Sequence, residues 1–270
     1  AAGMADAGYH VVMACRNQLK AEAAKQKLQQ QLADAQLDVM IVDLSDLDSV
    51  RDFAKLFRAR YSHLDVLINN GGILLYSAQT NATGIELQFA TNHLGHFLLT
   101  ALLIDIMPNE ASSRVISLSS VAHKEAQIHF DDLSCGGDGG IAYGQSKLAC
   151  LMFSDELNRR LRAVNSRIRS IPVHPGGSDS GLFKEMSQEQ YDSLKGMSQY
   201  IHSNADAAKP ALFAALDATA EGGTYYGPQG YEELSGPVGP AQRFAYSKRA
   251  DIATELWTRS EDLTGQRFSL

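Results

Sequence analysis

The sequence has 270 residues, 44% of them hydrophobic, which is enough to build the core of one large α/β domain or two small ones. Its formal net charge of −7 argues against nucleic acid or an anionic membrane surface as a partner, because both require a clustered excess of Lys and Arg. Three widely spaced cysteines, Cys15, Cys135 and Cys150, form no CxxC pair, which favours a reducing, cytoplasmic setting and argues against a disulfide framework or a zinc site. No apolar run has the length of a membrane span, so we expect none.

Short apolar runs alternate with segments of helical period, which is typical of βαβ units around a parallel sheet. The predicted strands are His10 to Cys15, Asp38 to Asp43, Leu64 to Asn69, Arg114 to Ser119, Arg167 to Val173 and Gly223 to Tyr226. The predicted helices are Asn17 to Ala35, Leu47 to Tyr61, Gly84 to Met107, Ala142 to Leu161 and Ala205 to Ala218. Each is long enough to cross back over a sheet. Without an internal repeat or a low-complexity linker, residues 1–270 are expected to form a single α/β domain.

Two irregular segments, Lys124 to Gly140 and Ser178 to Ser203, are long for a compact domain, and such connections often serve as functional lids. The tail after Leu234 is rich in Gly and Pro before a final predicted helix, Lys248 to Ser260. We expect this tail to pack on the edge of the sheet.

The sharpest local signal is a tyrosine and a lysine four residues apart in a predicted helix, Tyr143 and Lys147. This spacing places the two side chains on one helical face. A nearby ammonium favours the phenolate form of a tyrosine, so the pair can act as an acid-base group. The same spacing also arises by chance on many helices.

Polar residues and glycines follow the predicted strands where open α/β sheets place their ligands. Ser120 follows the strand from Arg114 and can donate to a substrate carbonyl. Asn70 and Gly71 follow the strand from Leu64, where glycine lets the backbone approach a cofactor closely. Asn92 lies in mid-helix, where propensity does not favour an amide, so we expect a tertiary role for it.

Two histidines in the same predicted helix, His93 and His96, are three residues apart. No carboxylate or thiol cluster accompanies them, so we interpret them as structural and predict no metal site. The strand from Arg167 ends in a rigid turn, Pro175 and Gly176, followed by the small polar residues Ser178 and Ser180.

In this order along the chain, these residues resemble the short-chain dehydrogenase/reductase family. Asn69-Asn70-Gly71-Gly72 matches its NNAG motif, Asn92 its helix asparagine, Ser120 its serine, Tyr143 and Lys147 its YxxxK, and Pro175-Gly176 its PG turn. The resemblance implies a Rossmann-like, doubly wound parallel sheet in a three-layer αβα arrangement. The phrases HVVMACRN, ATNHLGHFLL, SKLACLMFSDEL and ELWTRSEDLTG are similar to the retinol dehydrogenase-like branch, near the light-dependent protochlorophyllide reductases.

The resemblance also implies roles. Tyr143 would exchange a proton with the substrate oxygen while hydride moves to or from nicotinamide, and Lys147 would support Tyr143 and hold the ribose hydroxyls. Ser120 would orient the carbonyl, and Asn92 would hold a water that links Lys147 to solvent. The Pro175-Gly176 turn, with Ser178 and Ser180, would lie against the nicotinamide amide.

The end of the strand from His10 bears on the choice of cofactor. NAD binders carry Asp or Glu there for the ribose hydroxyls, whereas an Arg suits a 2′-phosphate. Arg16 stands there, so NADP(H) is favoured, although an exposed Arg after a strand is common without that role. Asp43 matches a family aspartate that contacts adenine; the alternative is a helix N-cap together with Ser45.

The sequence departs from the family pattern in several places. Gly71 replaces the usual Ala of NNAG, and Ser178 and Ser180 stand where an aliphatic residue and a Thr are common. Gly177 stands where the protochlorophyllide reductases carry a cysteine, which makes the photoenzyme the weaker match.

The resemblance predicts a hydrophobic alcohol, aldehyde or ketone as substrate. Apolar residues at near-helical spacing in the predicted lid favour this, although the stripe can equally pack on the domain or on a second subunit of a homo-oligomer. They are Leu182, Phe183, Met186, Tyr191, Leu194, Met197, Tyr200 and Ile201.

The start of the sequence, AAGMADAGYHVVMACRN, matches the end of the helix that follows the family's glycine-rich loop, with Gly8 as its C-cap. We therefore expect the sequence to be a fragment that lacks the first strand and the phosphate-binding loop. Since that strand is central, its absence predicts a gap in the sheet. A non-catalytic fold relative that has lost the nucleotide site is the alternative function.

Overall fold

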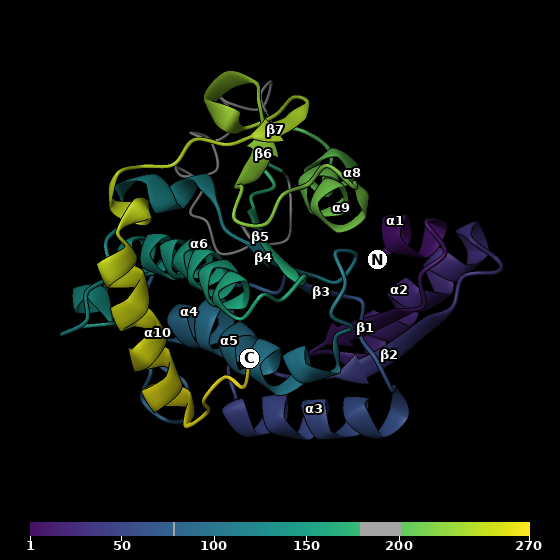
Figure 1. Ribbon diagram of the computed structural model, residues 1–270, viewed down its shortest axis with the longest axis horizontal. Coiled ribbons are helices and arrows are strands. Elements are labelled where there is room, and N and C mark those ends of the chain that lie inside the picture. The colour runs from purple at the N-terminus through teal and green to yellow at the C-terminus, as the bar shows by residue number, and fades with distance from the viewer. Residues whose placement is uncertain (78, 179–200) are drawn as a thin grey trace.

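The computed structural model describes residues 1–77, 79–178 and 201–270, in which helices flank a mostly parallel sheet (Figure 1). The strands are β1 (Val11–Cys15), β2 (Leu37–Ile41), β3 (Val66–Asn69), β4 (Arg114–Leu118), β5 (Arg169–Val173), β6 (Tyr226–Pro228) and β7 (Val238–Pro240). Every pairing between them is parallel except that of β6 with β7. The predicted Rossmann-like α/β fold is confirmed.

The sheet is divided at the place where a gap was expected. β1 pairs with β2, and the other strands form a second sheet in the order β3-β4-β5-β6-β7. Within the described part of the chain, β1 pairs only with β2, and β3 pairs only with β4. Each of these two strands therefore has one edge without a partner among the described strands. The short helix α1 (Ala2–Asp6) has its C-cap at Ala7, one residue before the predicted Gly8, and Gly8 follows it with a left-handed φ of 84°.

Several helices have the predicted positions with shifted ends. They are α2 (Gln18–Gln31), α3 (Leu47–Arg60), α6 (Gly139–Ala163) and α10 (Ala250–Thr264). The helix predicted at Ala205 to Ala218 is two helices, α8 (Asn204–Ala207) and α9 (Lys209–Leu216). Pro210 stands in the first turn of α9, where its missing N–H costs no hydrogen bond. The tail packs on the sheet edge as predicted, because β7 extends the sheet beside β6.

The helix predicted at Gly84 to Met107 is not regular. It consists of α4 (Leu87–Phe89), the π-helical turn η1 (Ala90–Leu94), α5 (Gly95–Leu103) and the 3₁₀ turn η2 (Ile104–Ile106). By length and composition the span Leu87–Ile106 could cross a membrane, contrary to the sequence-based expectation, but most of it is buried inside the fold. Asn92 lies inside the π turn, and such turns are frequent at functional sites.

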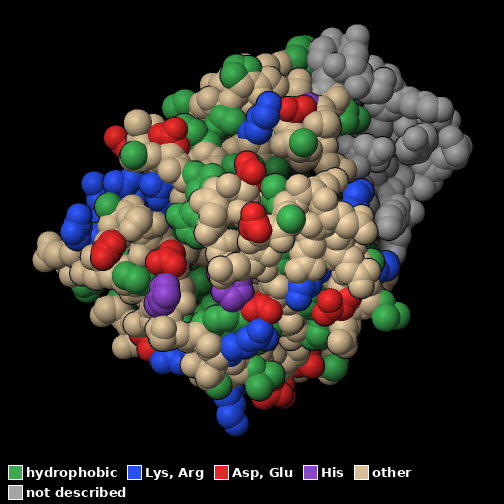
Figure 2. All heavy atoms as spheres, turned by 90° about the vertical axis from the view of Figure 1, so that its right-hand side faces the viewer, with side chains coloured by type: hydrophobic (Ala, Val, Ile, Leu, Met, Phe, Trp, Pro, Cys, Tyr) green, Lys and Arg blue, Asp and Glu red, His purple; other side chains and the backbone are tan. Residues whose placement is uncertain are grey.

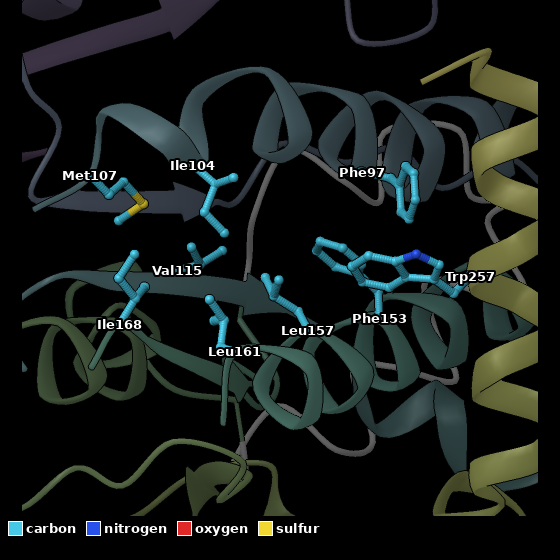
Figure 3. Close-up of a cluster of buried hydrophobic side chains, with 9 residues drawn as sticks. All are labelled: Phe97, Ile104, Met107, Val115, Phe153, Leu157, Leu161, Ile168 and Trp257. Carbon is cyan, nitrogen blue, oxygen red and sulfur yellow. The ribbon is translucent and has the colours of Figure 1, made fainter. Parts of the chain in front are cut away.

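Two apolar clusters cover the two faces of the larger sheet. Val115 of β4 packs with residues of α5, α6 and α10, among them Phe97, Phe153 and Trp257 (Figure 3). Its neighbour Ile116 lies in the cluster formed with α1 and α9. Adjacent strand residues point to opposite faces, so β4 is buried on both sides. This packing on both faces holds the carboxyl end of β4, beside which the site lies, in a fixed position.

Three of the four buried histidines, His93, His96 and His174, have pKa values far below the ordinary one; the fourth is His123. Burial lowers the pKa of His93 to about 3 and that of His96 to about 4. Burial, together with the nearby positive groups, lowers the pKa of His174 to about 3. All three rings are therefore neutral in the folded protein at neutral pH.

These histidines predict loss of stability in mild acid. In the unfolded chain they take up protons near the ordinary pKa of ~6.5, whereas in the folded chain they stay neutral down to about 4 or 3. The unfolded state then binds more protons, so the free energy of unfolding falls as pH drops below ~6.5, by up to ~1.4 kcal/mol per pH unit for each histidine.

Urea unfolding between pH 8 and pH 5 measures this effect. His93→Gln should reduce the slope below pH 6.5, whereas His63→Gln, at an exposed histidine, should leave it unchanged. A free energy of unfolding that is constant from pH 7 to pH 5 would contradict the prediction.

Candidate active site

The predicted acid-base pair lies on α6, beside the carboxyl end of β4. Tyr143 is half-buried, and Lys147 is buried with 6% of its surface exposed. The Lys147 ammonium lies 5.8 Å from the centre of the Tyr143 ring and donates to the Leu118 carbonyl at 3.2 Å. An ammonium has three donors, so Lys147 is anchored to the strand end with donors left for a ligand.

The side-chain amide of Asn92 joins α6 to the loop after β3. Its Oδ1 accepts from the Ile73 N–H at 2.8 Å, and its Nδ2 donates to the Ile73 carbonyl at 3.0 Å and to Ser146 Oγ at 2.9 Å. Asn92 is fully buried, so each of these bonds replaces one that water would otherwise supply. The tertiary role expected for a mid-helix amide is thus found.

The backbone carbonyl of Asn92 is also engaged. His96 Nδ1 lies 2.9 Å from it and Cys150 Sγ lies 3.0 Å from it. A carbonyl can only accept, so Nδ1 of the neutral His96 ring carries the proton. The water-holding role that the resemblance implies for Asn92 stays a prediction.

Ser120 lies at the start of η3 (Val121–Glu125), directly after β4. It is half-buried, and its Oγ accepts from the Ala122 N–H at 3.2 Å. A Cβ added to Gly144 of α6 would lie 3.1 Å from the Ala122 carbonyl oxygen, so a glycine here lets α6 approach this loop. Tyr143 and Ser120 therefore stand on two segments that pack against each other.

The two glycines after β3 lie against the polar groups of the site. A Cβ on Gly72 would lie 3.2 Å from Asn92 Oδ1 and 3.3 Å from the Lys147 ammonium. A Cβ on Gly71 would lie 2.7 Å from Leu44 Cδ1, so the family's Ala at this position would require the end of the Leu44 side chain to shift. Asn70 is exposed beside them. This loop leaves backbone accessible next to Lys147.

The Pro175-Gly176 turn follows β5. Gly176 has a φ of 75°, and its backbone packs directly on the Leu234 carbonyl, so a side chain is excluded there on both grounds. Ser178 is buried and forms an isolated bridge with His202. Ser180 and the apolar stripe from Leu182 to Tyr200 lie outside the described residues.

The predicted cofactor-selecting residues lie on the smaller sheet. Arg16 is exposed directly after β1, and Asp43 follows β2. Asp43 Oδ1 accepts from the Ser45 N–H at 2.9 Å and from Ser45 Oγ at 2.6 Å. The alternative interpretation of Asp43 as a helix N-cap is wrong, because Asp46 caps α3.

Sequence reasoning missed three residues that support the site. Gln88 is fully buried and bonds both backbone groups of Leu75 and the Gly139 carbonyl. Ser146 donates to the Tyr143 carbonyl and accepts from Asn92. Ser119 donates to the Lys147 carbonyl at 2.8 Å. For Ser146 and Ser119 the available signal was the one used for Asn92, namely a polar side chain inside an otherwise apolar helix or at a strand end.

Known proteins share both the sequence and the fold. A profile of the short chain dehydrogenase family matches residues 1–191. Human "Retinol dehydrogenase 11" is 36% identical over 268 residues, covering 97% of this chain and 80% of that protein. The Brassica napus protein "Short-chain dehydrogenase TIC 32 B, chloroplastic" is 38% identical over 228 residues, covering 80% of this chain and 71% of that protein.

A crystal structure of an uncharacterized protein from Mycobacterium paratuberculosis has a TM-score of 0.80 and 36% identity, covering 99% of this chain and 88% of that one. The family match extends over more than half of the chain, and the similarity to the retinol dehydrogenases extends over nearly all of it. The chain therefore belongs to the short-chain dehydrogenase/reductase family, in its retinol dehydrogenase-like branch.

Proposed function

We propose that this chain is an NADP(H)-dependent oxidoreductase that interconverts a hydrophobic alcohol and its aldehyde or ketone, with Tyr143 as the acid-base group. Membership of the family makes the chain an oxidoreductase with a nicotinamide cofactor. The observation that supports the finer proposal is the array of Gly72 with the buried Lys147 and Asn92, which lies beside Tyr143.

The residues present fit a nicotinamide dinucleotide. Gly71 and Gly72 leave backbone bare of side chains next to the Lys147 ammonium, where a ribose can approach. Lys147 and Tyr143 would hold that ribose, and Asn70 would line the same edge. The Pro175-Gly176 turn with Ser178, and with Ser180 by resemblance, would lie against the nicotinamide, while Asp43 would contact the adenine. When bound, the cofactor supplies or accepts the hydride.

The residues of the chain perform the proton chemistry. In the reducing direction, the Tyr143 hydroxyl gives its proton to the carbonyl oxygen of the substrate. Ser120 donates a hydrogen bond to that oxygen and orients it. The Lys147 ammonium stabilises the negative charge left on Tyr143, and the Leu118 carbonyl fixes the position of the ammonium.

The choice of NADP(H) is supported by Arg16, which is exposed at the end of β1, and among the described residues no carboxylate forms an ion pair with it. Figure 2 shows the face that carries the small sheet and α2, where basic and acidic side chains are interspersed. We therefore propose that the single guanidinium of Arg16, and not a basic surface, selects NADP(H) by binding its 2′-phosphate.

The substrate class, compartment and assembly are further parts of the proposal. Relatives named retinol dehydrogenases support an apolar alcohol or carbonyl. The three free cysteines, Cys15, Cys135 and Cys150, suit a reducing compartment such as the cytoplasm. A homo-oligomer is expected from the family.

Replacing the acid-base group should abolish turnover. With NADPH and a panel of aliphatic and aromatic aldehydes, loss of the reduced-nicotinamide absorbance should be at least ~100-fold slower in Tyr143→Phe, because general acid-base catalysis contributes about that much. Tyr9→Phe makes the same chemical change outside the site and should be as active as the unaltered chain. Equal rates in Tyr143→Phe and the unaltered chain would contradict the assignment, and absence of any NADPH binding would favour the non-catalytic alternative.

Removing the proposed selector should shift the cofactor preference. Arg16→Ala should weaken NADPH binding by ~10-fold or more, the size expected for one charge-assisted hydrogen bond, and leave NADH binding nearly unchanged. Fluorescence titration measures both constants. Lys20→Ala removes an equal charge from the exposed face of α2 and should leave the preference unchanged. Equal weakening of NADPH and NADH by Arg16→Ala would refute the selector role.

A further inference from the structure

A second set of buried polar side chains lies behind the Ser120 loop and the Pro175-Gly176 turn. Glu233 is 7% exposed, His123 1% and His174 0%, and Lys124 shows 18% of its side chain. None of these residues belongs to the acid-base machinery described above. Charged groups are rarely buried unless they are paired, so a carboxylate at this depth calls for a specific reason.

Glu233 makes polar contacts with three different segments. Its Oε2 lies 3.1 Å from the Lys124 ammonium, and its Oε1 accepts from the Gln242 N–H at 2.7 Å. His174 Nε2 lies 3.9 Å from Oε2. Since His174 Nδ1 accepts from the Gly176 N–H, the proton of the neutral ring is on Nε2 and faces the carboxylate.

The backbone that carries Glu233 is strained. Glu232 and Glu233 have φ angles of 49° and 58°, in the left-handed region that disfavours side chains. Two such residues in succession persist only where the surrounding contacts determine the conformation, and such outliers cluster near functional sites. The next residue, Leu234, accepts the Gly177 N–H at 2.8 Å, so the bend places this segment on the turn after β5.

Lys124 links the same carboxylate to the substrate-orienting serine. Lys124 belongs to η3, the turn that Ser120 begins, and the neighbouring His123 donates from Nδ1 to the Ser120 carbonyl at 2.6 Å. The attraction between two charges is stronger in this partly dry environment than at the surface, and removing one of them leaves the other buried without a partner. The Lys124–Glu233 contact therefore connects the loop that carries Ser120 with the segment that supports the Pro175-Gly176 turn.

We propose that Glu233 is a positioning residue which, through Lys124 and the Leu234 carbonyl, holds the Ser120 loop and the Pro175-Gly176 turn in one fixed arrangement. In this proposal Glu233 has no contact with substrate or cofactor, and it acts by keeping Ser120 aligned with the turn expected to border the nicotinamide. This inference rests on the proposed function for its kinetic consequence and on the contacts alone for its structural one.

Glu233→Gln tests the role because it keeps an acceptor for the Gln242 N–H and removes the charge that faces Lys124. We expect kcat to fall by about tenfold, which corresponds to ~1.4 kcal/mol, while the NADPH dissociation constant stays within about twofold. Hydrogen exchange should become faster in the amides of Ser120 to Glu125 and of Gly176 and Gly177, and stay unchanged in the core of α6. Glu232→Gln, at the exposed neighbour with the same backbone conformation, should alter neither readout.

A double-mutant cycle compares Glu233→Gln with Lys124→Met and with the double variant Lys124→Met/Glu233→Gln. If the Lys124–Glu233 ion pair holds the two loops in place, the fold-loss of kcat in the double variant should be smaller than the product of the two single fold-losses. The reason is that the double variant leaves no unpaired charge. Lys124→Met alone should reproduce the faster exchange in both loops, which preserves the test if Glu233→Gln does not fold.

The two proposals can fail separately. If the unaltered chain turns over no carbonyl, the proposed function fails, while the exchange measurement still decides the role of Glu233. Unchanged exchange in both loops in Glu233→Gln, or multiplicative losses of kcat across the cycle in an active enzyme, would overturn the inference.

Discussion

The side-chain amide of Asn92 is the interaction on which the geometry of the site depends. It bonds both backbone groups of Ile73 and the hydroxyl of Ser146, and so fixes the loop after β3 against α6. Because the amide is fully buried, a substitution would take away the partners of the Ile73 N–H and carbonyl, at a cost of about 1–3 kcal/mol for each group that stays unsatisfied. Gly72 and Lys147 meet at the same point, so an error there would displace the ammonium that lies beside the Tyr143 ring.

The interior of the fold beneath the site is apolar. Most polar side chains of the site are held in position by hydrogen bonds to the backbone. Val115 and Ile116 bury the two faces of β4, and the residues just beyond the strand end, Ser119 and Ser120, then stand at a rigid edge. Gly144 lets α6 approach that edge closely. Tyr143 and Lys147 therefore stand on a helix packed against this edge, and a helix holds its side chains more firmly than a loop does.

The sequence predicted the α/β fold, the order of its elements and the gap beside β1, because these follow from hydrophobic periodicity and from the ordered motifs. It did not predict the π turn around Asn92, since a single inserted residue leaves the apolar pattern of the helix almost unchanged. The division of α8 from α9 and the N-cap at Asp46 were also missed, because several neighbouring residues could have filled each role. The buried partners Gln88 and Glu233 could not be found, since their contacts come from residues distant in the sequence. The sequence was sufficient to predict that Tyr143 and Lys147 lie close together. It was not sufficient to predict which contacts hold the Ser120 loop and the Pro175-Gly176 turn.

The proposed reaction joins proton exchange at Tyr143 to hydride transfer from a nicotinamide. The most direct measurement is the reduction of an apolar aldehyde by NADPH that carries deuterium at both C4 positions, followed by mass spectrometry of the product. The proposed reaction yields an alcohol with one deuterium on the former carbonyl carbon. An alcohol without deuterium, or no alcohol at all, would contradict it.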